Sequence, residues 1–293
     1  MTYQERMIIR PPSEASSFLL PVTIGCSHNK CTFCGTYPGV KFRIRHLEDI
    51  KRDIDSVARN YSWSLRRVFL EEGDALIAPQ RLLVAVLKYL NEKFPYLERI
   101  GTYATPQAAL IKSVAELKEL NRLGLKIAYM GVETGNEELL KKINKGATYD
   151  QIVEAGRKLK QAGITLSVTV ILGLGGVEGS KKHALATAKI LSDIDPDFAG
   201  TLTILLVPGT PLHKEWGEGK FTLISPFQSL EELKLIIQNS NFTNCFFTAN
   251  HASNYLPIKV RLPEQKAEVI RLIDEVLAKK DMSRLRPEFT RAL

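Results

Sequence analysis

The stretch Phe18-Leu-Leu-Pro-Val-Thr-Ile-Gly-Cys26-Ser-His-Asn-Lys-Cys31-Thr-Phe-Cys34 joins an apolar run to three cysteines within nine residues. The chain holds one further cysteine, Cys245. Structural zinc sites close with four protein ligands, whereas a metal site that does chemistry keeps one position open. Thiolates also hold iron–sulfur clusters, usually four per cluster. The trio therefore favours a cubane cluster on Cys26, Cys31 and Cys34, with one iron left open.

Other interpretations of the trio are weaker. Three cysteines in a loop of Gly, Ser, His, Asn and Lys do not resemble small buried core residues. A disulfide framework is disfavoured, because cysteine content is low and no signal peptide is visible. A zinc site closed by His28 or Cys245 stays open as an alternative, although zinc modules usually draw two ligand pairs from separate segments.

Composition is ordinary for a soluble protein, and exposed thiolates suit a reducing cytoplasm. The 293 residues are 44% hydrophobic and 25% charged, and charge or glycine interrupts every long apolar stretch, so we expect no membrane span. The net charge of +8 allows an anionic partner such as RNA, a phosphate, a carboxylate or an acidic electron donor. The basic residues are dispersed without interleaved aromatic residues, so nucleic-acid binding is open but not indicated.

Short apolar runs alternate with amphipathic stretches. The runs predict strands at Ser17–Ile24, Arg67–Glu71, Arg99–Ala104, Lys126–Val132, Thr165–Leu172, Phe198–Val207 and Cys245–Thr248. The amphipathic stretches predict helices at Leu47–Arg59, Pro79–Glu92, Ser113–Leu123, Thr148–Ala162, Ser180–Ser192, from Ser229 onward, and at Pro263–Lys279. Ser113, Thr148 and Ser229 each begin a capping-box pattern.

This alternation indicates βαβ units and a parallel sheet. Six units are too few for a closed eight-unit barrel and favour an α/β fold of the partial (β/α)6 TIM-like type, with a doubly wound open sheet as the alternative. We expect the barrel to span residues 1–212. Residues 213–293 would form an extension that closes the barrel and contacts the substrate.

Glycine or polar side chains follow each predicted strand, as in Glu71-Glu-Gly-Asp74, Gly131-Val-Glu-Thr-Gly135 and Gly173-Leu-Gly-Gly176. In both candidate architectures, ligands bind beyond the carboxyl ends of the strands. Six such turns around one rim therefore predict a shared ligand pocket that includes the cysteine loop.

Together these motifs resemble the radical S-adenosylmethionine (radical SAM) superfamily, from about Ser17 to about Leu212. The resemblance implies a [4Fe–4S] cluster on Cys26, Cys31 and Cys34, whose open iron is chelated by S-adenosylmethionine (SAM). Reduction then cleaves the sulfonium, and a 5′-deoxyadenosyl radical abstracts hydrogen from a substrate. Four residues separate Cys26 from Cys31, where the family usually has three, which leaves the subgroup and the substrate open.

The resemblance also implies cofactor contacts. Phe33 corresponds to the aromatic residue beside the adenine, and Glu133 to the residue that reaches the ribose hydroxyls. The segment Glu72, Gly73 and Asp74 corresponds to the motif that receives the cofactor's ammonium, and Gly173 and Gly175 correspond to the glycine motif beside the adenine. Arg43 is a candidate for the cofactor's carboxylate, or simply faces solvent.

The segment from Asn244 to Tyr255 carries small polar groups that suit the barrel mouth. We expect His251 and Asn254 to contact substrate there, unless the segment is a plain surface loop. A pocket-facing Cys245 would return a hydrogen atom to a product radical.

The motifs most resemble those of the radical SAM branch that contains anaerobic coproporphyrinogen oxidase, the elongator catalytic subunit and the methylthiotransferases. The resemblance implies SAM, an unidentified substrate and a low-potential electron donor of the flavodoxin or ferredoxin type as partners. Two alternatives stay open. One is an iron–sulfur electron-transfer protein, and the other is a basic RNA-binding module with structural zinc.

Overall fold

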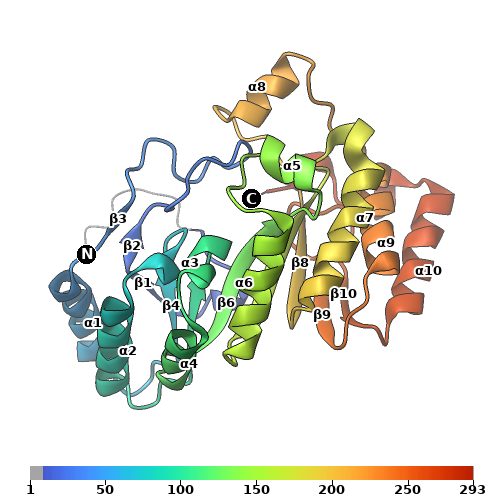
Figure 1. The fold of residues 1–293 in the computed structure, drawn as a ribbon. Coiled ribbons are helices and arrows are strands. Elements are labelled where there is room, and N and C mark those ends of the chain that lie inside the picture. Colours follow the sequence, from blue (N-terminus) through green and yellow to red (C-terminus); the bar gives the residue numbers. More distant parts are fainter. Residues whose placement is uncertain (1–8, 293) are drawn as a thin grey trace. The chain divides into compact units, whose positions relative to one another are not determined.

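The computed structural model describes residues 9–292, which divide into two compact units (Figure 1). The first unit comprises the chain up to Asn29 together with Thr36–Met130 and Glu154–Leu166. The second comprises Lys30–Gly35, Gly131–Val153 and the chain from Ser167 onward. The cysteine loop contributes to both units, since Cys26 belongs to the first and Cys31 and Cys34 to the second.

Parallel strands form the centre of the first unit. They lie side by side in the order β1 (Phe18–Pro21), β4 (Arg67–Glu71), β5 (Arg99–Tyr103) and β6 (Leu125–Glu133), and β6 ends in the second unit. The longer helices of this unit are α1 (Leu47–Tyr61), α2 (Gln80–Lys93), α4 (Val114–Arg122) and most of α6 (Tyr149–Gln161). Shorter elements are η1 (Pro12–Glu14), the antiparallel pair β2 (Thr23–Ile24) and β3 (Arg43–Ile44), η2 (Ala75–Ile77) and α3 (Pro106–Leu110).

The two faces of this sheet differ because strand side chains alternate. Phe69 of β4 packs edge-on against Tyr103 and Tyr129, with ring centroids 5.0 and 5.7 Å apart. Tyr129 donates a hydrogen bond to the buried carboxylate of Glu14, which also pairs with Arg99 at 2.6 Å. An aromatic layer above a fixed polar network thus covers the face that carries Phe69.

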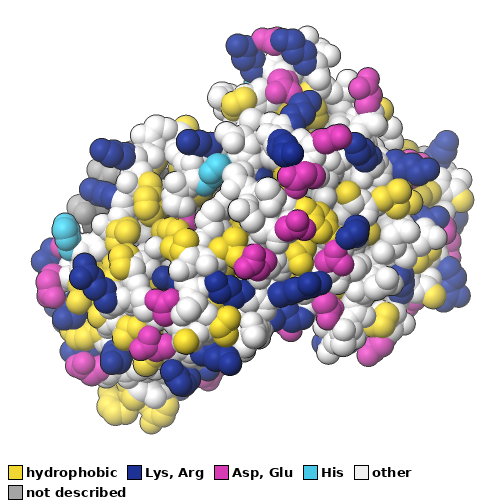
Figure 2. Space-filling model, viewed as in Figure 1, with side chains coloured by type: hydrophobic (Ala, Val, Ile, Leu, Met, Phe, Trp, Pro, Cys, Tyr) yellow, Lys and Arg dark blue, Asp and Glu magenta, His cyan; other side chains and the backbone are white. Residues whose placement is uncertain are grey.

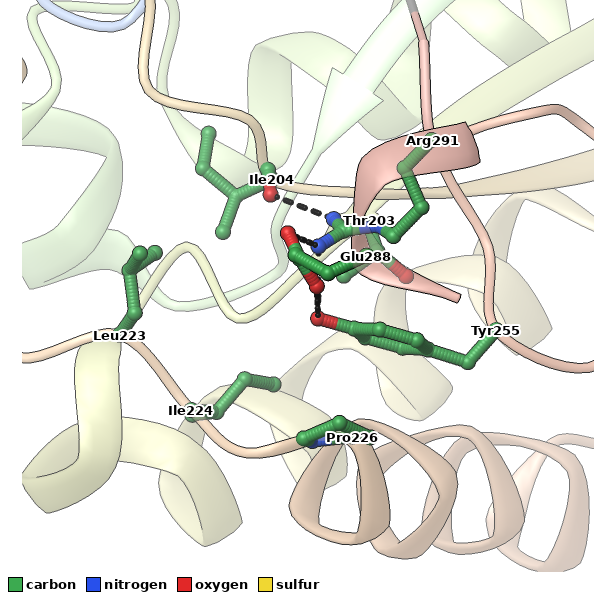
Figure 3. A pocket seen from close by; sticks show the side chains of 8 residues that line it. All are labelled: Thr203, Ile204, Leu223, Ile224, Pro226, Tyr255, Glu288 and Arg291. Carbon is green, nitrogen blue, oxygen red and sulfur yellow. Dashed lines mark hydrogen bonds and ion pairs between the residues drawn. The ribbon is translucent and has the colours of Figure 1, made fainter. Parts of the chain in front are cut away.

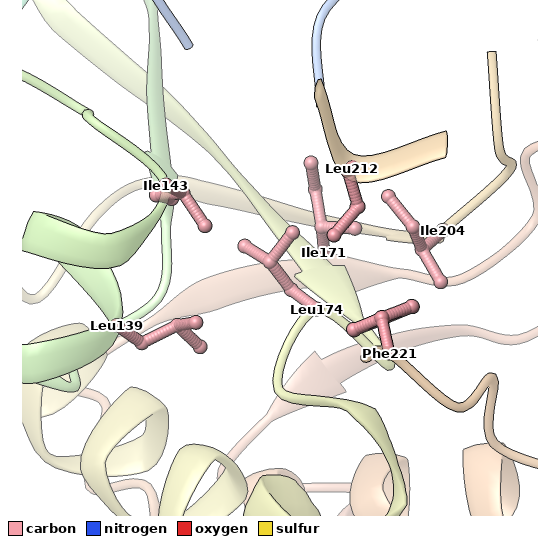
Figure 4. Packing of buried hydrophobic residues seen from close by; sticks show 7 residues of the cluster. All are labelled: Leu139, Ile143, Ile171, Leu174, Ile204, Leu212 and Phe221. Carbon is pink, nitrogen blue, oxygen red and sulfur yellow. The ribbon is translucent and has the colours of Figure 1, made fainter. Parts of the chain in front are cut away.

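The second unit continues the βα pattern. Its strands β7 (Thr165–Leu172), β8 (Phe198–Thr203) and β9 (Cys245–Thr248) are parallel, and β10 (Lys259–Leu262) pairs antiparallel with β9. Its helices are α5 (Glu137–Lys142), α7 (Gly176–Ile194), α8 (Pro211–Gly217), α9 (Pro226–Asn239), α10 (Lys266–Lys279), η3 (Met282–Arg284) and η4 (Glu288–Thr290). Seven apolar side chains form one buried cluster in this unit: Leu139, Ile143, Ile171, Leu174, Ile204, Leu212 and Phe221 (Figure 4).

The predicted fold class is confirmed as a mostly parallel sheet surrounded by helices. The capping box at Ser113 is confirmed, with both reciprocal bonds to Glu116 present. The predicted box at Ser229 is wrong. Helix α9 begins at Pro226, and its box joins Ser225 to Gln228.

The predicted division at residue 212 stays a prediction, and residues 213–292 belong to the same compact unit as β8. Between residues 9 and 292, no helix is long and apolar enough to cross a bilayer. Figure 2 shows basic side chains interspersed with acidic ones over the visible face, as the dispersed sequence charge predicts.

Candidate active site

The end of β4 holds the first cysteine through Glu72. The Oε2 atom of Glu72 accepts a hydrogen bond from the backbone N–H of Gly25 at 2.9 Å. Glu72 has φ of +79°, a left-handed conformation that residues other than Gly, Asn and Asp rarely adopt. Such strain tends to accumulate where function requires an unusual backbone. Burial, followed by the charge and hydrogen bond of Glu72, raises the pKa of Tyr37, so this phenol stays protonated.

Gly73 allows the closest approach between β4 and the cysteine loop. A Cβ atom at this position would lie 2.8 Å from the Cβ of Cys26 and 2.8 Å from Cε2 of Tyr37. Side-chain carbons do not approach that closely, so any larger residue would push Cys26 away. Glycine, which has no Cβ atom, is the residue that fits this position beside Cys26 and Tyr37.

Asp74 is completely buried and ties the same loop to β5. Its carboxylate accepts hydrogen bonds from Ser27 Oγ at 2.5 Å and from Thr105 Oγ1 and N at 2.9 and 3.1 Å. Burial raises the pKa of Asp74, while these donors and the charge of Lys112 favour its ionised form. The structure therefore shows Asp74 fixing the residue next to Cys26, with both oxygens already bonded inside the protein.

The neighbouring Glu71 is a residue that sequence reasoning missed. It ends β4, retains 3% of its surface exposed, and has an Oε2 atom without a hydrogen-bond partner in the described chain. Burial raises its pKa to about 7, helped by the adjacent charge of Glu72. Its position at the end of an apolar strand was the available signal.

In the second unit, Cys31 and Cys34 flank a tight turn in which Cys34 N–H donates to the carbonyl of Cys31 at 3.2 Å. Thr32 anchors the turn on both sides. Its N–H donates to Ile143 O at 2.9 Å, and its carbonyl accepts from Leu212 N–H at 3.0 Å. Phe33 packs against the apolar cluster of this unit. The turn is therefore fixed by both backbone and core contacts.

The end of β6 presents Glu133, also left-handed with φ of +66°. Its Oε1 accepts a hydrogen bond from Nζ of Lys145 at 2.7 Å. A Cβ atom on Gly131 would lie 2.1 Å from that same Oε1, so a larger residue at this position would displace the carboxylate. Lys145 was not identified from sequence, since only the fold brings it to Glu133.

Gly173 follows β7, and its N–H donates to Oε2 of Glu232 at 2.6 Å. Glu232 lies fully buried on α9, and burial raises its pKa to about 7. Its neighbour His183 is also buried, with Nε2 3.0 Å from the carbonyl of Ile171, which can only accept. Nδ1 of His183 must then accept from the hydroxyl of Thr134, 2.8 Å away. Burial lowers the pKa of His183 to about 4, consistent with this neutral form.

The model of the radical SAM superfamily matches residues 20–188, more than half of the chain. The chain belongs to the radical SAM superfamily. An uncharacterized protein of Methanocaldococcus jannaschii is 27% identical over 77% of this chain and 72% of its own length. A tRNA-2-methylthio-N(6)-dimethylallyladenosine synthase of Clostridium novyi is 28% identical over 70% of this chain and 46% of its own.

Among solved structures, coproporphyrinogen III oxidase from Escherichia coli matches with a TM-score of 0.58 and 19% identity, over 76% of this chain and 51% of that one. The chain thus spans about half the length of the oxidase and of the methylthio synthase. The fold is that of a radical SAM enzyme, and such enzymes bind a [4Fe–4S] cluster and SAM.

The residues of this chain fit those cofactors. Three thiols are the donor set that leaves one iron of a cubane open. Cys26 sits where Gly73 leaves room for it, and the turn of Cys31 and Cys34 is held by Thr32. Cys26, Cys31 and Cys34 remain the predicted cluster ligands, each fixed within its own unit.

Other predicted residues have different surroundings. Arg43 is exposed on β3. Gly175 precedes α7, where an added Cβ would lie 3.2 Å from the backbone of Gly179. Asn254 is buried, and its amide bonds both Thr201 O at 2.7 Å and Thr203 Oγ1 at 2.9 Å, which indicates a structural role. His251 is half-buried, and its Nδ1 bonds Ser253.

Cys245 does not lie where a hydrogen donor is needed. It begins β9, so it lies at the amino edge of the parallel strands, opposite to the edge where their ligand-binding turns are. It is also completely buried. Both observations disfavour a hydrogen-donor role for Cys245.

A small pocket lies in the second unit near the end of β8, lined by Thr203, Ile204, Leu223, Ile224, Pro226, Tyr255, Glu288 and Arg291 (Figure 3). The guanidinium of Arg291 donates to Tyr255 Oη, Glu288 Oε1 and Ile204 O. The polar groups that the pocket presents are therefore largely bonded to one another.

Proposed function

We propose that this chain is a radical SAM enzyme whose cluster, held by Cys26, Cys31 and Cys34, cleaves SAM reductively, and that the resulting 5′-deoxyadenosyl radical abstracts hydrogen from a substrate. The observation that carries the proposal is the contact of Cys26 with Gly73, which joins the cysteine loop to the turn after β4. The family match over residues 20–188 supports it.

When bound, the cluster and SAM supply the bond cleavage, and the protein's part is placement and exclusion of competing groups. Glu72 fixes the backbone before Cys26, and Asp74 fixes Ser27 after it. Glu133, oriented by Lys145, offers a carboxylate for ribose hydroxyls. Glu232 holds the N–H of Gly173 and so shapes the glycine turn that would lie beside the adenine.

The test is anaerobic reconstitution with iron and sulfide, followed by dithionite and SAM. We expect one [4Fe–4S] cluster per chain and formation of 5′-deoxyadenosine. Cys31→Ala should lose both. Cys245→Ala is the matched control, because this thiol lies at the opposite edge of the strands and should leave both unchanged. A Cys31→Ala protein that still forms 5′-deoxyadenosine would overturn the proposal.

The same measurements separate the two alternatives. An intact cluster without SAM cleavage would favour an electron-transfer protein. Zinc without sulfide, with RNA binding that falls steeply as salt rises, would favour the RNA-binding module.

The substrate class is the next question. Because one relative is a tRNA-modifying synthase, we propose tRNA as the first substrate to test, alongside porphyrinogens. Transfer of deuterium from a labelled candidate into 5′-deoxyadenosine would identify the hydrogen donor. We further propose a low-potential flavodoxin or ferredoxin as electron donor, in the cytoplasm, where exposed thiols stay reduced.

A further inference from the structure

A cavity of about 230 Å³ lies in the second unit at the carboxyl end of β8 (Figure 3). Thr203, the last residue of β8, and the following Ile204 form part of its lining. Ligands of parallel α/β folds bind beyond the carboxyl ends of the strands. Sites for whole small molecules usually measure about 300–1,000 Å³, so this cavity has room for one end of a ligand.

The apolar wall of the cavity lies against the glycine turn after β7. A Cβ atom on Gly173 would lie 2.9 Å from Cδ1 of Ile224 and 3.0 Å from Cγ2 of Ile204. Both isoleucines line the cavity. On the proposed function this turn would lie beside the adenine, so a ligand held in the cavity is a neighbour of the cofactor.

Two donors in the cavity hold one carboxylate between them. Nη1 of Arg291 donates to Oε1 of Glu288 at 2.6 Å, and the hydroxyl of Tyr255 donates to Oε2 of the same residue at 2.7 Å (Figure 3). Two donors on two oxygens match the shape of a carboxylate. The guanidinium is itself fixed, because it also donates to the carbonyls of Ser253 and Ile204. We call Arg291 and Tyr255 the carboxylate clamp.

The clamp holds a side chain that is mostly in solvent. Glu288 begins the single turn η4, and its side chain is 67% exposed, whereas that of Arg291 is 4% exposed. Burial opposes ionisation of Glu288, but the bonds from Arg291 and Tyr255 lower its pKa, so the clamp favours a charged carboxylate. An exposed ion pair stabilises a protein only slightly. A ligand carboxylate can therefore replace Glu288 on the same two donors at little cost.

The charge and the lining of the cavity favour a carboxylate over a phosphate. Arg291 is the one cation among the described residues that line it, and a displaced Glu288 stays nearby. One cation beside a retained carboxylate matches a single negative charge better than the two of a phosphate monoester. The apolar lining suits an apolar body next to the acid, and it consists of Ile204, Leu223, Ile224 and Pro226.

We propose that Arg291 and Tyr255 bind the carboxylate of a small apolar acid, which is the substrate, and that Glu288 occupies the clamp when this acid is absent. That the acid is the substrate rests on the proposed radical SAM function. The proposal predicts that tRNA, whose anionic groups are phosphodiesters, is not the ligand of this cavity.

The test measures binding of a simple acid to the full-length chain. The probe is trifluoropentanoate, followed by the fluorine relaxation of the ligand, and trifluoropentanamide is its neutral control. We expect saturable binding of the acid and none of the amide, because only the acid is charged where Arg291 donates.

Two variants should change the affinity for the probe in opposite directions. Glu288→Ala removes the internal competitor and should strengthen binding by about twofold to fivefold, as expected when an exposed ion pair no longer has to open. Tyr255→Phe removes one donor to the charged group and should weaken binding by about tenfold. Glu264→Ala, an exposed acid outside the lining, is the control and should leave the affinity unchanged. A purely structural role of the two residues would not give a gain with Glu288→Ala.

Competition identifies the class of ligand. Displacement of the probe by unlabelled pentanoate, and not by SAM or a short oligouridylate, supports the inference. Displacement by SAM would assign the clamp to the cofactor, and displacement by the oligouridylate would assign it to RNA. Either result would overturn the inference.

Equal binding of the acid and its amide, or no gain in affinity with Glu288→Ala, would also overturn it. Should Tyr255→Phe fail to fold by circular dichroism, Glu288→Ala decides. Binding of the probe requires no cleavage of SAM. A wild type that binds the probe but forms no 5′-deoxyadenosine would therefore defeat the proposed function and leave the carboxylate clamp supported, and the reverse result would defeat the clamp alone.

Discussion

Lys145 and Glu133 form an ion pair of 2.7 Å in which the two side chains are only 12% and 11% exposed. Glu133 holds a left-handed backbone at the end of β6, and Gly131 leaves the space that its carboxylate fills. The lysine thus neutralises and orients a carboxylate whose backbone is already unusual. The effect of such a buried pair on the free energy of unfolding is tested by removing one partner, because the remaining buried charge then has no counter-charge.

Lys145→Met should therefore destabilise the protein by about 3 kcal/mol or more, since it leaves a buried carboxylate unpaired. Urea unfolding at pH 7.5 measures this. Lys141→Met removes an exposed partner of Glu137 instead and should cost less than about 1 kcal/mol. Adding Glu133→Gln to Lys145→Met should recover part of the loss. Equal effects of the two lysine substitutions would contradict the buried-pair interpretation.

Gly73→Ala should impair cluster assembly with little change in secondary structure. The added methyl would lie 2.8 Å from Cys26 Cβ, so the cysteine must move. Iron and sulfide content after reconstitution, with far-ultraviolet circular dichroism, measures the effect. Gly217→Ala is the control, because nothing lies within 4 Å of its added Cβ. Full cluster content in Gly73→Ala would show that the loop has more room than the structure gives it.

Glu232 should make stability depend on pH. Its folded pKa is raised from 4.5 to about 7, so the folded state holds a proton that the unfolded chain releases at lower pH. The contribution of Glu232 to the free energy of unfolding is therefore fully present below about pH 4.5, and it is lost as the pH rises through 7. The size is about 3 kcal/mol, because each pKa unit corresponds to about 1.4 kcal/mol.

Glu232→Gln removes this titration while its amide oxygen still accepts from Gly173. Relative to wild type, the variant should therefore gain stability between pH 5 and pH 8, by a few kcal/mol. Urea unfolding of both proteins at the two pH values measures it. The same stability difference at both pH values would rule out Glu232 as the titrating group.

Strand positions and the ligand-binding edge could be predicted because both follow from local pattern. Strands Arg67–Glu71, Thr165–Leu172 and Cys245–Thr248 have the predicted bounds. The same direction rule places Cys245 at the start of β9 and so away from the ligand-binding edge. Strand direction therefore disfavours the predicted hydrogen-donor role of Cys245.

The remaining differences arise from tertiary contacts and from competing local signals. The resemblance points to Glu72 and Asp74, whereas strand alternation places Glu71 on the buried face of Phe69. Two capping patterns follow one another at the start of α9, from Ser225 to Gln228 and from Ser229 to Glu232, and Pro226 at the first helical position favours the earlier one. The partners Lys145 of Glu133 and Glu232 of Gly173 lie 12 and 59 residues away, beyond any local pattern.

Arg291 should anchor the C-terminal segment of the described chain to the end of β8. Its side chain is 4% exposed, its Nε donates to Ser253 O at 2.7 Å, and its guanidinium lies 4.2 Å above the ring of Tyr255. Arg291→Met keeps much of the volume but loses the charge-assisted bonds to Tyr255 and Ile204, each worth about 1.5 kcal/mol. The pair with Glu288 adds less, because the Glu288 side chain is largely exposed.

We expect this variant to unfold at a lower urea concentration than wild type. Because the segment loses its anchor, trypsin should also cleave within residues 282–290 before it cleaves the rest of the chain. Arg284→Met, an exposed arginine of η3, is the matched control and should resemble wild type apart from the trypsin site that it removes. Mass spectrometry of the limited digest measures the order of cleavage. Equal stability of Arg291→Met and Arg284→Met, with the same order of cleavage elsewhere in the chain, would contradict the anchor role of the guanidinium. The segment would then be held by apolar contacts, such as those of the buried Leu285.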